Sequence, residues 1–311
     1  MKVKPTPLVW RDGQLVPWEQ ATVHVASHSL HYGGGIFSGG RCYRSEKYGQ
    51  VIFRLPDHAR RLVDSCHMYY MGYGECRLEY SAEELASAIV ETVAANRLVP
   101  CYIRPLIIRG YGELGVSPLK SPVQVFIFVQ DWGQYVGGEA GARVCISPYR
   151  RMRDDMMPMA AKCTANYANG QLIKAHAILH GYDEGIALTH DGYVSEGSGE
   201  NVFFVTDGVL HTPDLGSSIL NGIMRRTVIT LARDLGYEVR EERVPVSMFT
   251  LAEEVFFTGS AAEITPIGQI DRHIFKQAPG PVTSRLKEQL FAIINGDEED
   301  SYQWLTPVTL S

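Results

Sequence analysis

"YVSEGSGENVFFV", residues 193–205, decides the fold of the second half of this chain. One Asp-Gly pair precedes it at 191–192 and another follows at 207–208, and such pairs between apolar runs are typical of β-hairpin turns. Glu196 lies among small residues, which let another group approach the backbone closely. We therefore expect hairpin-connected strands with Glu196 placed to meet a ligand; a turn glutamate that faces solvent is the commoner alternative.

The sequence on either side of this stretch predicts further elements. Residues 8–18, "LVWRDGQLVPW", alternate around an Asp-Gly pair and predict another hairpin. Ser81 and Glu84 have the spacing of a capping box, which predicts the start of a helix. Residues 221–236, "NGIMRRTVITLARDLG", predict an amphipathic helix with Asn221 as its N-cap and a glycine just past its end.

Strand and helix patterns alternate through both halves of the chain, which predicts an α/β protein of the α+β type. A length of 311 residues fits two domains. We expect a small N-terminal α/β domain over residues 1–132, an interdomain loop over 133–144 and a large C-terminal domain over 145–311. Because ligand pockets form preferentially where domains meet, we expect the site between the two domains.

Charge and composition exclude several functional classes. The net charge is −6 and no basic stripe is present, which argues against nucleic-acid binding. No apolar stretch is long enough to span a bilayer, and the first residues lack the apolar core of a secretory signal, so we expect a cytoplasmic protein. The six cysteines form no Cys-x-x-Cys pair, and His28 and His31 have no carboxylate partners at useful spacing, so we expect neither disulfides nor a metal site.

Lys162 lies in "PMAAKCTANY", residues 158–167, among small and apolar neighbours. A lysine held out of water loses the solvation of its charged form, so its pKa falls and its neutral amine becomes a nucleophile. The alternative is a surface lysine whose ammonium reaches water, which is the better interpretation of a lysine taken alone.

Three segments could bind a phosphate group. The helix start in "LNGIMRR", residues 220–226, offers backbone N–H groups and the positive end of a helix dipole. The small-residue turn in "TGSAAEIT", residues 258–265, could offer further N–H groups. Arg61 in "HARRL" could bind a phosphate with two N–H groups, although its neighbour Arg60 could be the inward one instead.

The order of these motifs is more informative than any one of them. Together they resemble the class IV, or fold-type IV, pyridoxal-phosphate-dependent aminotransferases, and among these the chain is most similar to bacterial branched-chain amino acid aminotransferases. The likeness extends over almost the whole chain and rests on "SHSLHYG", "FSGGRCY", "HARRL", "YIRPL", "AAKCTANY", "SEGSGENVFFV", "LNGIMRR" and "GSAAEITPI".

The resemblance implies roles for individual residues. Lys162 would form the Schiff base and carry the proton, which makes it the catalytic residue. Residues that would bind pyridoxal 5'-phosphate are Arg61, Lys162, Tyr167, Glu196, Leu220, Gly222, Ile223, Met224 and Ser260. Residues that would line the substrate pocket are Tyr32, Phe37, Gly39, Tyr102, Arg104, Trp132, Tyr135, Ser260 and Ala261.

The resemblance also implies the reaction and the assembly. L-leucine, L-isoleucine or L-valine would react with 2-oxoglutarate by a ping-pong Schiff-base mechanism, giving the 2-oxo acid and L-glutamate. The fold would be the two-domain D-amino acid aminotransferase type, with the cofactor between the domains. The partners would be small amino and 2-oxo acids and further copies of the chain, as a homodimer or as a hexamer built from three dimers.

The chain departs from the family pattern at three positions. Ser38 stands where the family usually has glutamate, Gly40 where it has a larger aliphatic residue, and Met224 where it often has a hydroxyl residue. We therefore hypothesise a roomier pocket. Three alternatives stay open: a D-amino acid or (R)-amine transaminase of the same fold, a transaminase of broad specificity, and a relative that binds the cofactor without turnover.

Overall fold

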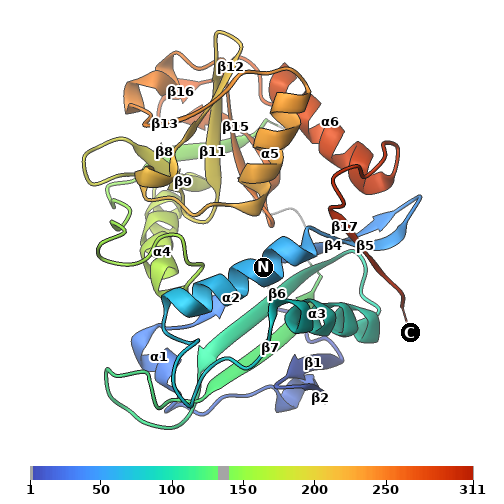
Figure 1. Ribbon diagram of the computed structural model, residues 1–311. Helices are drawn as coiled ribbons and strands as arrows, with labels where there is room; N and C mark the ends of the chain where they lie inside the picture. Colours follow the sequence, from blue (N-terminus) through green and yellow to red (C-terminus); the bar gives the residue numbers. More distant parts are fainter. Residues whose placement is uncertain (1–2, 132–139, 311) are drawn as a thin grey trace. The chain divides into compact units, whose positions relative to one another are not determined.

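The computed structural model describes residues 3–131 and 140–310 and has the predicted mixture of helices and strands (Figure 1). The described residues pack as two compact units: the first contains 3–131, 161–165 and 292–310, and the second contains 140–160 and 166–291. The predicted α/β class is confirmed, whereas the predicted domain boundaries stay a prediction. No helix in the described ranges is long and apolar enough to cross a membrane.

The first unit is built on an antiparallel sheet. In spatial order its strands are β17 (Leu305–Val308), β5 (Gly49–Phe53), β4 (Gly40–Ser45), β6 (Cys101–Arg109), β7 (Val123–Gln130), β1 (Leu8–Arg11) and β2 (Gln14–Pro17), and β3 (Ile36–Phe37) pairs with β6. Its helices are α1 (His28–Tyr32), α2 (Leu55–Met68) and α3 (Ala82–Asn96), with a 3-10 turn at Trp18–Gln20.

One face of this sheet forms the core of the first unit. Leu62 of α2 and Ile89 of α3 pack with Ile103 and Ile107 of β6 in one buried cluster. Because successive side chains of a strand point to opposite faces, Arg104 and Leu106 of β6 belong to the other face. The strand alternation thus separates core residues from candidate site residues.

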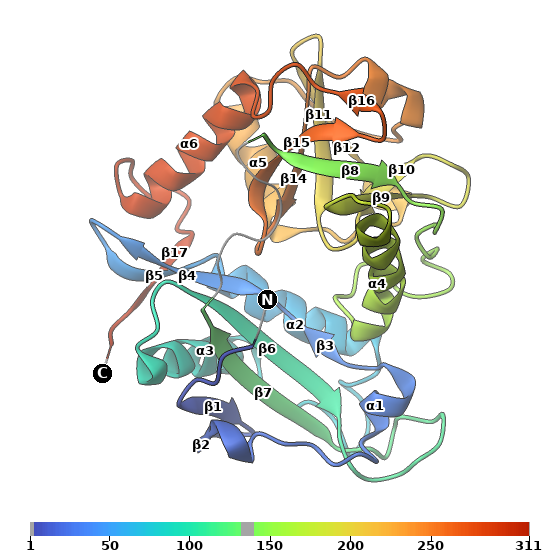
Figure 2. The same ribbon diagram turned by 180° about the vertical axis from the view of Figure 1, so that it is seen from behind.

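The second unit is built on a mixed sheet. In spatial order its strands are β10 (Val194–Gly197), β9 (Glu184–Leu188), β8 (Ala142–Ile146), β15 (Glu263–Ile270), β14 (Glu254–Gly259), β11 (Asn201–Thr206), β12 (Val209–Pro213) and β13 (Val239–Glu242), and β16 (His273–Ile274) pairs with β15. Strand β8 runs parallel to both of its neighbours, as Figure 2 shows from behind. The helices are α4 (Thr164–Leu179), α5 (Ile223–Asp234) and α6 (Pro281–Asn295), with 3-10 turns at Leu215–Ser217 and Val246–Thr250.

Local sequence signals placed several of these elements correctly. Arg11 pairs with Gln14 across the predicted hairpin, and the two turn residues have the positive φ values of 45° and 99° that an Asp-Gly turn permits. The pair at 207–208 joins β11 to β12 in the same way. The capping box is present in full: Ser81 Oγ accepts from Glu84 N at 3.1 Å, and Glu84 Oε2 accepts from Ser81 N at 2.8 Å.

One sequence-based boundary was wrong. Helix α5 begins at Ile223 with Gly222 as its N-cap, so Asn221 does not cap it. Strand β8 begins at Ala142, within the range 133–144, and the interdomain loop expected there stays a prediction. The glycine expected past the end of α5 is correct, because Gly236 has a φ of 85° directly after the helix.

Candidate active site

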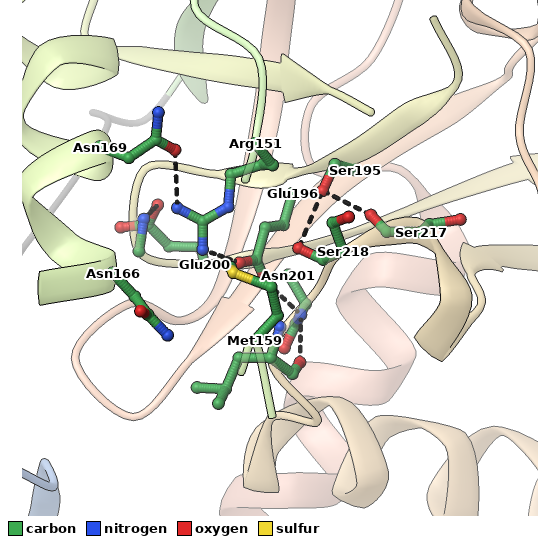
Figure 3. A network of polar contacts seen from close by, with 12 residues as sticks. Arg151, Met159, Asn166, Asn169, Ser195, Glu196, Glu200, Asn201, Ser217 and Ser218 are labelled. Atoms are coloured by element: carbon green, nitrogen blue, oxygen red, sulfur yellow. Dashed lines mark hydrogen bonds and ion pairs between the residues drawn. The ribbon is translucent and has the colours of Figure 1, made fainter. Parts of the chain in front are cut away.

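Glu196 is a buried carboxylate at the centre of a polar network in the second unit (Figure 3). Its Oε1 accepts a hydrogen bond from Arg151 Nη2 at 2.5 Å. Its Oε2 accepts from Asn201 Nδ2 and from the backbone N–H of Leu220, both at 3.0 Å. One cation and two further donors stabilise the ionised form, so Glu196 carries its negative charge despite a solvent exposure of 4%. The alternative of a solvent-facing turn glutamate was therefore wrong.

Arg151 is fixed from its other side. Its Nη1 donates to Asn169 Oδ1 of α4 at 3.3 Å, and Asn169 Nδ2 donates to the backbone oxygen of Arg150 at 3.0 Å. Figure 3 shows the guanidinium of Arg151 reaching from Asn169 to Glu196. The side chain of Arg151 is only 4% exposed, so its charge and that of Glu196 balance one another in a place with little water.

Asn201 connects this carboxylate to the segment before α5. Its Nδ2 also donates to the backbone oxygen of Leu220 at 2.9 Å. A Cβ atom at Gly222 would overlap the Oδ1 of Asn201, so only glycine fits beside this amide. Ser195 Oγ donates to the backbone oxygen of Ser217 at 2.7 Å and holds the beginning of the same segment. The position of Leu220 therefore depends on side chains from β10 and β11.

The start of α5 has the properties of an anion site. Gly222 caps the helix without any side-chain hydrogen bond, and the positive end of the helix dipole lies at this first turn. The side chains of Ile223 and Met224 at this first turn are buried. Ser260 and Ala261 form the partly buried turn between β14 and β15. Asn201 pairs with Thr258, two residues before this turn, and so links it to the start of α5.

Tyr167 lies on α4, beside the loop that follows Glu196. A Cβ atom at Gly199 would lie 3.5 Å from Cε1 of Tyr167, which places the ring against that loop. Of the residues expected to bind the cofactor, the second unit thus brings together Tyr167, Glu196, Leu220 and Gly222.

Lys162 belongs to the first unit, where its backbone is held on both sides. Its N–H donates to Ser65 Oγ at 3.1 Å, and its carbonyl oxygen accepts from the N–H of Phe37 at 3.1 Å. Its side chain is partly buried, and Nζ lies 4.9 Å from the centre of the Phe37 ring. The amine therefore lies against an aromatic face in a partly buried position.

Aromatic and cationic side chains gather around the same phenyl ring. The guanidinium carbon of Arg104 lies 4.9 Å from the centre of Phe37, and Nη2 donates to the hydroxyl of Tyr102 at 3.1 Å. A Cβ atom at Gly39 would overlap that hydroxyl, so the glycine leaves room for Tyr102. This group therefore combines an apolar wall with one cation.

Arg61 faces inward on α2, whereas its neighbour Arg60 is exposed. Nη2 of Arg61 donates to Ser38 Oγ at 3.2 Å, and Ser38 Oγ lies 2.9 Å from His58 Nδ1. A cavity of about 10 Å³, enough for one water molecule, adjoins Ser38 and Gly40 on the side of α2 and α3. The small residues at these two positions thus leave space in the core side of the sheet.

Five expected pocket residues are not placed in this group, and two of them, Ser260 and Ala261, lie in the turn of the second unit described above. Tyr32 is 45% exposed on α1, and its ring packs 4.6 Å from that of His28. Trp132 and Tyr135 lie outside the described residues. No group of three or more His, Cys, Asp or Glu side chains within 3–131 and 140–310 could hold a metal ion.

Sequence reasoning missed two residues that hold Glu196. Arg151 lies in the basic run "YRRMR", which looks like a solvated surface, and no local pattern distinguishes the arginine that turns inward. Asn201 stands inside the motif "SEGSGEN", but its function depends on Leu220 and Gly222, which lie about twenty residues away in the chain.

Comparisons with known proteins agree on one family. The family model for amino-transferase class IV matches residues 42–270. The branched-chain-amino-acid aminotransferase of Salmonella typhimurium is 42% identical over 313 aligned residues, which cover 99% of each chain. A crystal structure of the Escherichia coli branched-chain amino acid aminotransferase, also 42% identical, matches 98% of this chain and 100% of that chain with a TM-score of 0.93.

A further solved structure carries a bound molecule. The T.th. branched-chain amino acid aminotransferase, complexed with N-(5'-phosphopyridoxyl)-L-glutamate, is 41% identical and matches 99% of this chain and 100% of that chain with a TM-score of 0.91. The likeness in sequence and in fold thus extends over the full length of these relatives, and the resemblance found in the sequence motifs is confirmed: this chain belongs to the class IV amino-transferase family.

Proposed function

We propose that this protein is a pyridoxal-phosphate-dependent branched-chain-amino-acid aminotransferase. Its substrates would be L-leucine, L-isoleucine and L-valine, with 2-oxoglutarate as the amino acceptor and L-glutamate and the 2-oxo acid as products. The relatives at 40–42% identity that carry this name support the substrate class. The observation that carries the chemistry is the buried Glu196, which keeps its charge through Arg151, Asn201 and Leu220.

The residues present suit this cofactor. The Glu196 carboxylate is the group that would hold the pyridine nitrogen protonated, and the bound cofactor would then act as an electron sink for the substrate's Cα carbanion. The backbone N–H groups of Ile223 and Met224 at the first turn of α5, together with Ser260 and Arg61, would hold the phosphate. Leu220 would pack on the ring face, and Tyr167 would donate a hydrogen bond to the phenolic oxygen.

Lys162 would bind the cofactor covalently and then move the proton. An amine acts as a nucleophile or base only when neutral, so Lys162 would react as the free amine. During turnover Nζ would take the proton from the substrate Cα and return it to the cofactor carbon. The ammonium thus formed would lie near an aromatic face, which stabilises it.

The group around Phe37 would bind the substrate side chain. Phe37, Gly39 and Tyr102 would form an apolar wall for leucine, and Arg104 would bind the distal carboxylate of glutamate. One pocket would thus accept both substrates of the two half-reactions. Trp132, Tyr135, Tyr32 and Ala261 complete the proposed pocket on the strength of the family resemblance.

We further propose a cytoplasmic homo-oligomer, a dimer or a hexamer built from three dimers. The family resemblance supports this assembly. Sedimentation velocity of the purified protein tests it, and a monomer at micromolar concentration would contradict it.

The test of the function is the visible absorption spectrum of the purified protein before and after addition of L-leucine alone. We expect a yellow protein whose band is lost as the cofactor is aminated, and a Lys162→Ala variant that folds but shows no turnover. A yellow protein that responds to D-leucine or to an (R)-amine instead would assign the other substrate class. A colourless protein that takes up no added pyridoxal phosphate would contradict the proposal.

A further inference from the structure

A second buried glutamate, Glu200, lies directly beyond the loop that follows Glu196. It is 3% exposed. Its Oε2 accepts one hydrogen bond, from the backbone N–H of Gly199 at 3.1 Å, and its Oε1 is buried without a partner among the described residues. The side chain packs over two glycines. A Cβ atom at Gly197 would lie 2.7 Å from Glu200 Oε2, and a Cβ atom at Gly259 would lie 3.8 Å from Glu200 Cγ. The proposed reaction assigns this carboxyl group no role.

The charges around Glu200 do not balance if every carboxyl group is ionised. Glu184 is fully buried and pairs with Lys174 Nζ at 2.7 Å. Glu196 pairs with Arg151. Glu200 itself forms no ion pair among the described residues, so an ionised Glu200 would leave an unpaired negative charge in a buried place, which is strongly unfavourable.

The contacts decide which of the three carboxyl groups holds a proton. Glu196 accepts from a cation and two neutral donors, and Glu184 accepts from a cation and from the backbone N–H of Gly185. Within the described ranges, Glu200 accepts only from one neutral N–H. Because hydrogen bonds and cations favour the ionised form, the proton stays on the carboxyl group that has the fewest of them.

We propose that Glu200 is a positioning residue that stays protonated behind Glu196, so that Glu196 remains the ionised carboxylate available to the cofactor's ring nitrogen. The first half of this statement concerns the protein alone, and the second half rests on the proposed function. The groups that act on Glu200 are Glu184 of β9, Lys174 of α4 and Glu196 of β10. Burial, together with the charges of Glu184 and Glu196, raises the pKa of Glu200 to about 8, although Lys174 acts in the opposite direction.

The first test measures how the free energy of unfolding depends on pH, which gives the number of protons that the folded protein binds in excess of the unfolded chain. A folded-state pKa above the unfolded value gives stability that is fully present below the unfolded pKa and is lost as the pH rises toward about 8. Glu200→Gln stays neutral at every pH. Between about pH 5 and 7.5 we therefore expect the unfolding constant of the wild type, divided by that of Glu200→Gln, to rise tenfold per pH unit.

Exposed Glu253 offers the matched control, because Glu253→Gln should leave this ratio constant over the same range. A constant ratio for Glu200→Gln as well would overturn the proposal. If that variant does not fold, the wild-type infrared spectrum decides: a neutral-carboxyl carbonyl band at pH 7 that is lost by pH 9 supports the proposal, and its absence at pH 7 overturns it.

The second test concerns the site. We expect the kcat profile of the wild type to change near pH 8 and that of Glu200→Gln to lack this change, since its neutral amide cannot ionise behind Glu196. If the kcat–pH profiles of the wild type and of Glu200→Gln superimpose, the positioning role of Glu200 is overturned, whereas its protonation remains supported by the first test. A protein with no transaminase activity but with the expected proton count would contradict the proposed function and leave the protonation of Glu200 supported.

Discussion

The pairing of Arg151 with Glu196 gives a prediction whose size follows from the structure. Arg151→Met keeps an unbranched, mostly apolar side chain but removes the guanidinium group and its charge. Glu196 then retains its two neutral donors at 3.0 Å but has lost its cation. Breaking a buried pair in this way costs about 3–5 kcal/mol, because the charge that remains has little water around it.

Proton uptake by Glu196 sets an upper limit to that cost. A glutamate in an unfolded chain has a pKa of about 4.3, so protonating one at pH 7 costs about 3.7 kcal/mol, and at pH 5 about 1 kcal/mol. We therefore expect Arg151→Met to lose about 3 kcal/mol at pH 7 and no more than about 1 kcal/mol at pH 5. The sign follows because the folded variant binds one proton more than its unfolded chain, so its stability falls as the pH rises.

Urea unfolding followed by circular dichroism at both pH values measures the two losses. Arg153→Met is the matched control, because Arg153 pairs with Asp155 at 2.6 Å where both side chains are at least half exposed. Such a surface pair contributes about 0–1 kcal/mol, and its loss should differ little between the two pH values. If Arg151→Met cost as little as the control at pH 7, or cost more at pH 5 than at pH 7, the account of a buried and charged Glu196 would be refuted.

Three further changes test other parts of the site. Gly222→Ala should push aside Asn201 and weaken binding of pyridoxal phosphate more than about tenfold in a fluorescence titration, whereas Gly34→Ala, with open space around its Cβ, should not. Gly40→Ala should raise the free energy of unfolding in urea by about 0.5–1 kcal/mol, because its Cβ meets no atom closer than 4.0 Å and alanine costs less backbone entropy; a loss of stability would contradict this. Arg104→Met should raise the KM for L-glutamate about 10–100-fold relative to that for L-leucine, because the variant loses one charge-assisted hydrogen bond to the distal carboxylate. Equal effects on both substrates would argue against the proposed role of Arg104.

Local chemistry made much of the fold predictable. Asp-Gly turns permit the positive φ that tight hairpins need, so the hairpins at 12–13 and 207–208 could be placed from a few residues. The capping box at Ser81 is equally local. The predicted N-cap of α5 was wrong by one residue, because asparagine is the better cap by side-chain chemistry. The observed cap is Gly222, and a Cβ atom at this position would overlap the side chain of Asn201.

The supports of the candidate site were not predictable in the same way. The sequence motif singled out Glu196, but its burial depends on Arg151, forty-five residues earlier in the chain. The charge imbalance at Glu200 likewise arises only when Glu184 and Lys174 are brought alongside by the sheet and by α4. Contacts between distant segments carry no local pattern, so the sequence identifies the candidate site carboxylate more readily than the groups that support it.

The backbone around Lys162 bears on how the amine proposed as catalytic would be positioned. Its N–H is bonded to Ser65 and its carbonyl to Phe37, and two residues later the N–H of Thr164 donates to the oxygen of Gly35 at 2.7 Å. These hydrogen bonds restrict the main chain on both sides of Lys162, so motion of the amine comes from rotation of the side chain about a fixed Cα. In the proposed reaction, the amine would therefore reach its successive partners by rotation of its own side chain alone.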